Sequence, residues 1–270
     1  MPSARIGDID IHHQIAGEGP RLLYIGGTGG DLRVSPNIFD GPLVRHFSVA
    51  AYDQRGLGQS SKPDRLATMA EYAGDAAGLL EHLGWAGAVV VGVSFGGMVA
   101  QELAITRPDL VERLVLCCTS SGGAGGASYP LHRLADLAPD ERRRTRLAIS
   151  DTRHDDTWQR TEPEEAAKLL AQMAAAEAKP GSGDPEAAIG ARRQLEARIG
   201  HDTWDRLSEI TAPTLVAAGR YDGIAPVANS EAMVSRLANA ELQTFEGGHL
   251  FLRQDRSAWP AILAFLLDQA

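Results

Sequence analysis

The chain has 270 residues and a formal net charge of −9, with 44% hydrophobic and 23% charged residues. These values are those of an ordinary globular protein that can bury one large core and carry one inserted subdomain. The negative charge, without any basic stripe, argues against a nucleic-acid or anionic-membrane partner.

Membrane and secretory segments are not expected. No apolar run approaches the roughly 18 residues that span a bilayer, and the first residues lack the apolar segment of a secretory signal. The only two cysteines, Cys117 and Cys118, are adjacent in an apolar run. We expect them to be reduced core residues of a cytoplasmic protein.

The first half of the chain alternates strand and helix patterns. Apolar residues recur at helical spacing between Thr68 and Leu83, and Gly84 ends that pattern. In chain order we predict a hairpin over Ala4–Ala16, strands Arg21–Gly26 and Phe47–Tyr52, helix Thr68–Leu83, strand Ala88–Val91, helix Met98–Ala104 and strand Leu114–Cys118. This alternation predicts a parallel sheet that helices cover on both faces.

The pattern changes after Thr119. We predict helices over Tyr129–Leu137, Pro139–Ser150, Pro163–Ala178 and Pro185–Ile199, with a break at Lys179–Asp184. A strand over Pro213–Gly219, a helix over Ala228–Leu237, a strand over Glu241–Phe245 and a helix over Ser257–Gln269 follow. We therefore divide the chain into a core (residues 1–120 and 211–270) and a helical cap (residues 121–210).

Ser94 is the most informative residue of the chain. It stands in Gly92-Val93-Ser94-Phe95-Gly96, between an apolar strand and a helix. A serine flanked by glycines at such a tight turn is typical of a nucleophile elbow, which exposes the hydroxyl at the carboxyl edge of a sheet. We predict Ser94 as a catalytic nucleophile.

A serine nucleophile requires a base and an acid that orients the base. Of the eight histidines, His249 follows the last predicted strand within a glycine loop, which lets its imidazole turn toward Ser94. Asp222 directly follows the strand that ends at Gly219, whereas no carboxylate follows the Leu114–Cys118 strand. We assign His249 as the base and Asp222 as the acid, in the chain order that accompanies an elbow.

An oxyanion hole requires two backbone N–H groups. Phe95, the residue after the nucleophile, supplies one of them. We choose Thr28, in the loop Gly26–Gly30 after the first buried strand, for the other. This loop fits neither dinucleotide-binding nor P-loop spacing, which argues against a phosphate cradle.

Four ordered motifs resemble those of the α/β-hydrolase fold over nearly the whole chain: the loop Asp53–Ser60, the elbow Gly92–Gly96, the acid turn Gly219–Asp222 and the histidine loop Gly247–His249. The resemblance implies a mostly parallel eight-stranded sheet flanked by helices, with an inserted helical cap. Among its branches the chain is similar to capped bacterial esterases, enol-lactone hydrolases and cofactor-free haloperoxidase-like proteins. One departure is that most relatives carry His-Gly before the oxyanion residue, where this chain has Gly26-Gly27. In the relatives that histidine braces the loop.

The resemblance implies hydrolysis of a small carboxylic ester or lactone through an acyl-enzyme on Ser94. A serine nucleophile argues against the haloalkane dehalogenase and epoxide hydrolase branches, which use aspartate. Val93 stands where carbon–carbon bond hydrolases usually show asparagine. Hydrolysis of a carbon–carbon bond or a thioester, a biosynthetic cyclase, and a slow-turnover ligand receptor are the alternatives.

Substrate contacts are predicted from Gly27 and from the cap. We expect the cap to form an apolar wall of the substrate pocket with Trp158, Met173 and Trp204. For a substrate that carries a carboxylate, we expect a cation from Arg192, Arg193 or Arg198. No ligand spacing implies a metal or another cofactor. We expect the protein to be a monomer or a homodimer. Its expected binding partner is a small-molecule ester or lactone substrate.

Overall fold

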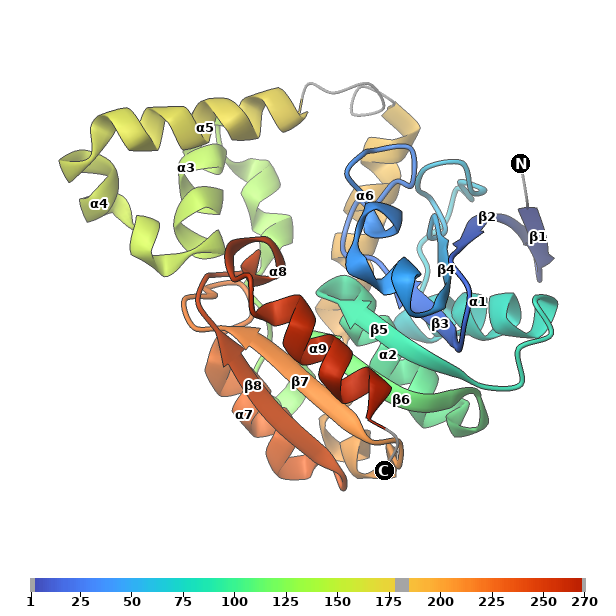
Figure 1. Ribbon diagram of the computed structural model, residues 1–270. Helices are drawn as coiled ribbons and strands as arrows, with labels where there is room; N and C mark the ends of the chain where they lie inside the picture. Colours follow the sequence, from blue (N-terminus) through green and yellow to red (C-terminus); the bar gives the residue numbers. More distant parts are fainter. Residues whose placement is uncertain (1–2, 178–184, 269–270) are drawn as a thin grey trace.

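An eight-stranded sheet forms the centre of the protein (Figure 1). The computed structural model describes residues 3–177 and 185–268. The strands lie in the order β1-β2-β4-β3-β5-β6-β7-β8, with antiparallel pairing of β1 with β2 and β2 with β4, and parallel pairing beyond. They are β1 (Ser3–Ile6), β2 (Ile9–Ala16), β3 (Arg21–Ile25), β4 (Ser48–Tyr52), β5 (Ala88–Val93), β6 (Val111–Cys117), β7 (Thr214–Gly219) and β8 (Ala240–Phe245). This is the mostly parallel sheet that the sequence predicts.

Helices cover both faces of the parallel strands, which explains why the central strands β5 and β7 are buried over almost their whole length. Successive residues of a strand face opposite sides, so Leu22 and Leu23 of β3 belong to two separate core clusters. The Leu23 face is covered by α1 (Met69–His82), α2 (Phe95–Thr106) and α7 (Val227–Arg236). The Leu22 face is covered by α9 (Ala258–Leu267), which crosses the front of the sheet in Figure 1. Cys117 and Cys118 are buried and unpaired, as predicted.

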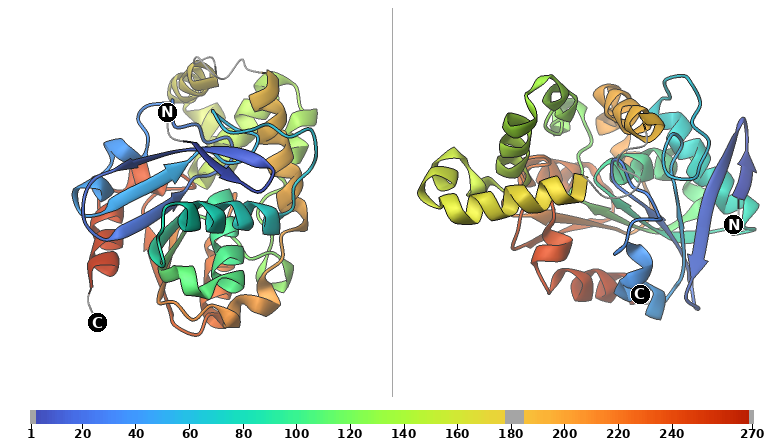
Figure 2. Two further views of the ribbon diagram at one scale, coloured as in Figure 1. Left: turned by 90° about the vertical axis from the view of Figure 1, so that its right-hand side faces the viewer. Right: turned by 90° about the horizontal axis from the view of Figure 1, so that it is seen from above.

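A helical insertion separates β6 from β7. It contains α3 (Pro139–Ser150), α4 (Asp156–Thr161), α5 (Pro163–Glu177) and α6 (Pro185–Ala197) and lies beyond the carboxyl ends of the parallel strands (Figure 1). Both Figures 1 and 2 show α3, α4 and α5 together, while α6 lies apart from them, beside the loops that follow β3 and β4. Of the described helices, none is both long and apolar enough to cross a membrane.

Two helix predictions need correction. The segment predicted as a helix over Tyr129–Leu137 forms only a 3-10 helix over Leu131–Asp136. Proline disfavours helical backbone in the residue before it, here Tyr129, and Pro130 itself has a non-helical ψ of 71°. The helix predicted to end at Ile199 ends as α6 at Ala197 and continues as a 3-10 turn over Arg198–Gly200. The sequence pattern missed α4 and α8 (Phe251–Gln254), which are too short to show periodicity. The predicted break at Lys179–Asp184, and the predicted ends at Ala178 and Gln269, lie outside the described residues.

Two chain segments cross where the insertion leaves and rejoins the sheet. The N–H of Thr203 donates to the Ser121 carbonyl (2.8 Å), and Nε2 of His201 lies 3.2 Å from the Ser120 carbonyl oxygen. His201 is buried, and its Nδ1 has no partner within the described part of the chain. Burial lowers the pKa of His201 to about 4. The folded protein therefore holds this imidazole neutral.

A buried ion pair joins the loop after β4 to α1. Arg55 donates from Nε and Nη2 to the two carboxylate oxygens of Asp75, at 2.6 and 2.7 Å. The side chains are only 6% and 4% exposed, so neither charge is well solvated. Removal of Asp75 would leave the buried Arg55 charge with only the carboxylate of Glu71, 3.9 Å away, as compensation.

Replacing Asp75 by asparagine should lower the free energy of unfolding by about 3 kcal/mol, because the Arg55 guanidinium stays buried with only the more distant Glu71 carboxylate, 3.9 Å from Nη1, as a counter-charge. Urea titration followed by circular dichroism measures the change. Asp109→Asn is the matched control, since Asp109 forms an exposed ion pair with Arg107, and its midpoint should stay at the wild-type value. Equal midpoint shifts in the two variants would contradict a specific role for the buried pair.

The protein should lose stability as the pH falls from about 6.5 to about 4. In this range the imidazole of His201 binds a proton in the unfolded chain but stays neutral in the folded chain. A folded pKa of about 4 makes the contribution of His201 about 3 kcal/mol, present in full above the unfolded pKa near 6.5. Melting curves of the wild type and His201→Asn between pH 4 and pH 8 measure it. A wild-type slope that persists unchanged in His201→Asn would exclude this origin.

Candidate functional site

Ser94 lies at a strained turn between β5 and α2. Its backbone has φ 54° and ψ −115°, a conformation that costs a non-glycine residue about 1–3 kcal/mol. No side chain fits at the two glycines: a Cβ on Gly92 would lie 2.5 Å from the Gly96 oxygen, and one on Gly96 would lie 2.1 Å from the Ile25 oxygen. The Ser94 N–H donates to the Cys117 carbonyl at 2.8 Å. Packing against neighbouring strands therefore holds the serine in its strained conformation.

Ser94, His249 and Asp222 form a continuous chain of hydrogen bonds. Nε2 of His249 lies 2.9 Å from Oγ of Ser94, and its Nδ1 lies 2.8 Å from Oδ2 of Asp222. The three residues are up to 155 positions apart in sequence, and they meet because β5, β7 and β8 all end at the same edge of the sheet. The structure thus brings together the three residues that the sequence pattern singled out.

The surroundings of Asp222 determine the direction of these bonds. Its Oδ1 accepts the N–H groups of Ile224 (2.8 Å) and Ala225 (2.9 Å), and the residue is 4% exposed. A carboxylate held as an acceptor requires the proton of the neutral imidazole on Nδ1. Nε2 of His249 is then unprotonated and accepts from the Ser94 hydroxyl. This is the arrangement in which a histidine can take the proton of a nucleophilic serine.

Two backbone N–H groups near Ser94 are free. Neither the Thr28 nor the Phe95 amide donates to an acceptor within residues 3–177 and 185–268. Gly27 packs against the serine, since a Cβ there would lie 3.6 Å from Cβ of Ser94. The loop that carries Thr28 is thus next to Ser94.

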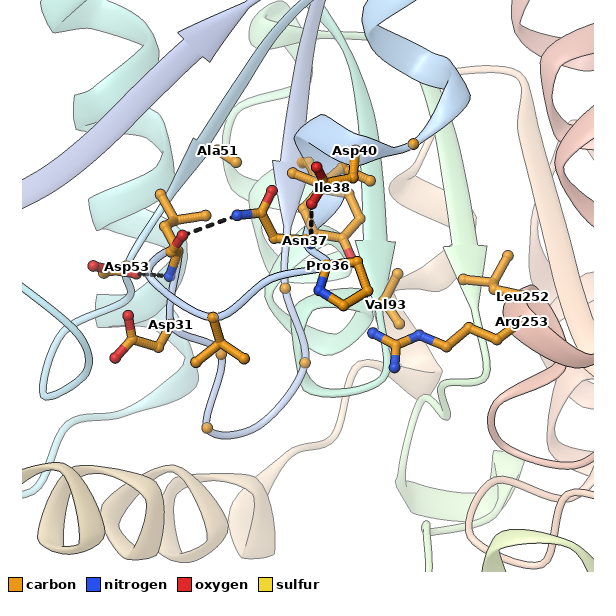
Figure 3. Close-up of a pocket in the computed structure, with 18 of the residues that line it drawn as sticks. Asp31, Pro36, Asn37, Ile38, Asp40, Ala51, Asp53, Val93, Leu252 and Arg253 are labelled. Atoms are coloured by element: carbon orange, nitrogen blue, oxygen red, sulfur yellow. Dashed lines mark hydrogen bonds between the residues drawn. The ribbon is translucent and has the colours of Figure 1, made fainter. Parts of the chain in front are cut away.

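A cavity of about 620 Å³ opens beside this hydrogen-bond chain. Gly27, Val93 and His249 form its wall toward Ser94, and the loop after β3 and helix α8 form much of the remainder. Figure 3 shows the carboxylates of Asp31 and Asp53 on one side of the cavity and Arg253 on the opposite side. The site therefore has room for a small organic molecule.

The two carboxylates in the cavity wall, those of Asp31 and Asp53, both have partners within the protein. Asp31 is paired with Arg33, which holds the pKa of the Asp31 carboxyl below its usual range. Asp53 accepts the N–H groups of Leu32 (2.7 Å) and Gln59 (2.9 Å). These carboxylates shape the loop after β3, which is the part of the wall that carries Thr28.

The cap residues predicted to contact substrate lie elsewhere. Trp158, Met173, Arg192 and Trp204 are not among the residues that line the cavity. Trp204 packs against Gly125 and the core, and Trp158 packs on His154. Among the residues that the structure describes, no three His, Cys, Asp or Glu side chains gather as a metal site.

The arginines predicted for a substrate carboxylate are engaged with protein groups. Arg192 is paired with Glu196 on the helix surface, and Arg193 contacts Asp64 and the Pro63 carbonyl. Arg198 donates to the Tyr129 carbonyl at 3.4 Å, and burial lowers its pKa to about 10. These three therefore have structural contacts, although Arg198 has no carboxylate partner among the described residues.

Two glutamines at the loop Gly26–Gly30 were missed from the sequence. Gln54 donates from Nε2 to the Gly26 carbonyl (2.8 Å), and Oε1 of Gln194 accepts the Gly29 N–H (2.9 Å). Gln54 lies within the loop Asp53–Ser60, one of the four motifs that resemble the α/β-hydrolase fold, so the sequence offered a signal that it lies near the site. Gln194 shares a helix face with Gly190, four residues earlier, but nothing in the sequence indicates which loop that face contacts.

Comparisons with known proteins agree with this geometry. A family model described as alpha/beta hydrolase fold matches residues 20–254. The poly(3-hydroxyalkanoate) depolymerase of Ectopseudomonas oleovorans is 31% identical over 92% of this chain and 84% of its own length. The crystal structure of the enol-lactonase from Burkholderia xenovorans LB400 is similar with a TM-score of 0.76 and 25% identity, over 99% of this chain and 100% of that one. A hydrolase from Pseudomonas aeruginosa PA01 has a TM-score of 0.71 and 28% identity, over 99% and 98% of the two chains.

Proposed function

Since the chain belongs to the α/β-hydrolase fold family, we propose that it hydrolyses a small carboxylic ester or lactone through an acyl-enzyme on Ser94. The observation that carries the proposal is the hydrogen-bond chain from the Ser94 hydroxyl through His249 to Asp222, at 2.9 and 2.8 Å. The names of two relatives, a polyester depolymerase and an enol-lactonase, support an ester or lactone as the bond that is cut.

In the proposed reaction Ser94 attacks the substrate carbonyl while His249 takes its proton on Nε2. Asp222 keeps the other imidazole proton on Nδ1 and stabilises the imidazolium that forms. The N–H groups of Thr28 and Phe95 bind the oxyanion. His249 then protonates the leaving oxygen, and a water that it activates cleaves the acyl-enzyme.

The cavity beside His249 is the proposed binding place of the acyl or alcohol part of the substrate. Gly27 and His249, which both contact Ser94, line the cavity, although Ser94 itself does not. The reacting carbonyl is therefore proposed to lie at the edge of the cavity, beside these two residues. Within the helical insertion, proposed as a cap over residues 121–210, α6 is the helix in contact with the loop that carries Thr28. The proposed core is formed by residues 1–120 and 211–270.

Ser94→Ala should lower kcat/KM on short p-nitrophenyl esters or enol lactones on the order of 10⁴-fold or more, because the nucleophile is lost. Ser208→Ala, at an exposed serine of the insertion, is the control and should keep wild-type turnover. Asp222→Asn should also lose about 10⁴-fold, because the imidazole tautomer is no longer held.

Mass spectrometry of the protein after a reaction with substrate is quenched identifies the residue that carries the acyl group. A panel of oxygen esters, lactones and acyl thioesters should give an acyl adduct on Ser94, and the fastest substrate class defines the reaction. Turnover, or labelling by a serine-hydrolase probe, that persists in Ser94→Ala would exclude the proposed mechanism. Wild-type reaction with thioesters alone would exclude an ester or lactone substrate.

A further inference from the structure

The loop Gly26–Gly30 has little intrinsic reason to keep one shape. Four of its five residues are glycine, and glycine is the residue with the largest conformational freedom. The structure gives the loop an internal hydrogen bond from Gly30 to Gly27, at 3.3 Å. Its shape, and with it the direction of the Thr28 N–H, must therefore be maintained by groups from outside the loop.

The two missed glutamines supply those outside contacts. Gln54, from the loop after β4, holds the Gly26 carbonyl, and Gln194, from α6, holds the Gly29 N–H. The two contacts lie on either side of Thr28. They brace the loop from two elements that are far from it in sequence.

Helix α6 is seated closely enough to hold Gln194 in place. Gly190 packs directly on Gly56, since a Cβ on Gly190 would lie 1.9 Å from the Gly56 oxygen. Arg193 contacts Asp64 on the same loop of the core. Gln194 follows on the same helix face and is fully buried.

The amide of Gln194 is not explained by folding alone. Because the Gly29 N–H is a donor, the Gln194 oxygen must face it, and this leaves Nε2 as a buried donor without an acceptor in the described part of the chain. A buried donor without a partner costs about 1–3 kcal/mol. An apolar side chain of the same size would remove that donor but would leave the Gly29 N–H without its acceptor. The two choices therefore cost a similar free energy, so stability by itself does not favour a glutamine here.

From these contacts we propose that Gln194 is a positioning residue of the oxyanion hole. It accepts the Gly29 N–H, thereby directs the N–H of Thr28 toward Ser94, and makes the hole depend on the seating of α6 against the core. The inference rests on the proposed function, because it assigns to Gln194 a role in the same acyl transfer.

Gln194→Met tests the proposal with a side chain of similar size that cannot accept the hydrogen bond. Removal of an oxyanion donor lowers kcat about 10²–10³-fold, and a displaced donor should lower it about 10- to 100-fold. KM should change less than about 3-fold, because the ground-state carbonyl gains little from the hole. The melting temperature should stay within about 2 °C of the wild type, since the substitution removes one unpartnered donor, Nε2, and leaves another, the Gly29 N–H.

Inhibition by a tetrahedral analogue distinguishes a positioning role of Gln194 from a purely structural one, because a structural role would leave the inhibition constant unchanged. The inhibition constant of an alkyl boronic acid, which forms an oxyanion-like adduct with a serine, should rise in Gln194→Met by the same factor as kcat falls. Gln172→Met, at an exposed glutamine on α5, is the control and should match the wild type in all three measurements.

Gly190→Ala tests the dependence on α6. A methyl group at Gly190 must lift the helix from Gly56, so the variant should lose kcat to a similar degree as Gln194→Met. The double variant should lose little more than either single variant, because both act through the same contact.

The results separate this inference from the proposed function. If the wild type turns over no faster than Ser94→Ala, the proposed function fails. If turnover depends on Ser94 while Gln194→Met keeps its kcat, or loses only substrate affinity, the positioning role alone is excluded. A melting temperature that falls together with kcat in Gln194→Met would identify a purely structural residue.

Discussion

The site depends on a steric constraint at the turn that carries Ser94. The serine has a backbone conformation that an L-residue seldom adopts, and the turn closes because Gly92 and Gly96 offer no side chain to the neighbouring backbone. The adjacent strands β3 and β6 are then close enough to hold it. Every other part of the site is arranged around the hydroxyl that this turn presents.

The loops around Ser94 have different sources of rigidity. Asp222 and His249 are held by hydrogen bonds within their own turns and to the insertion, such as the bond from the His249 N–H to the Ser150 carbonyl (2.6 Å). The glycine loop with Thr28 has little of this kind and relies on Gln54 and Gln194 from two other elements. The proposed base and acid are thus held by hydrogen bonds of their own turns and of α3, whereas the proposed oxyanion donor depends on two glutamine side chains from other elements.

Prediction from the sequence was strongest where a pattern is local. The strands, α1, and the elbow follow from apolar periodicity and from glycine spacing, and the structure has them close to the predicted bounds. The segment Tyr129–Leu137 was assigned the wrong helix type because the prediction gave no weight to Pro130, which disfavours helical backbone at Tyr129 and has a non-helical ψ of 71°. Trp204 was predicted to face substrate, but nothing in the sequence reveals that it packs on Gly125.

By itself the sequence indicated which chemical groups the protein can use: a serine in an elbow, and a histidine and an aspartate each placed after a strand. Its alternation of strands and helices also predicted a parallel sheet. Only the tertiary structure decided how those groups are oriented and what surrounds them. The physical reason is the distance along the sequence between the residues that interact. Turn geometry and strand burial follow from neighbouring residues, whereas the contact of Gln194 with Gly29 and the cavity beside His249 arise from segments far apart in sequence.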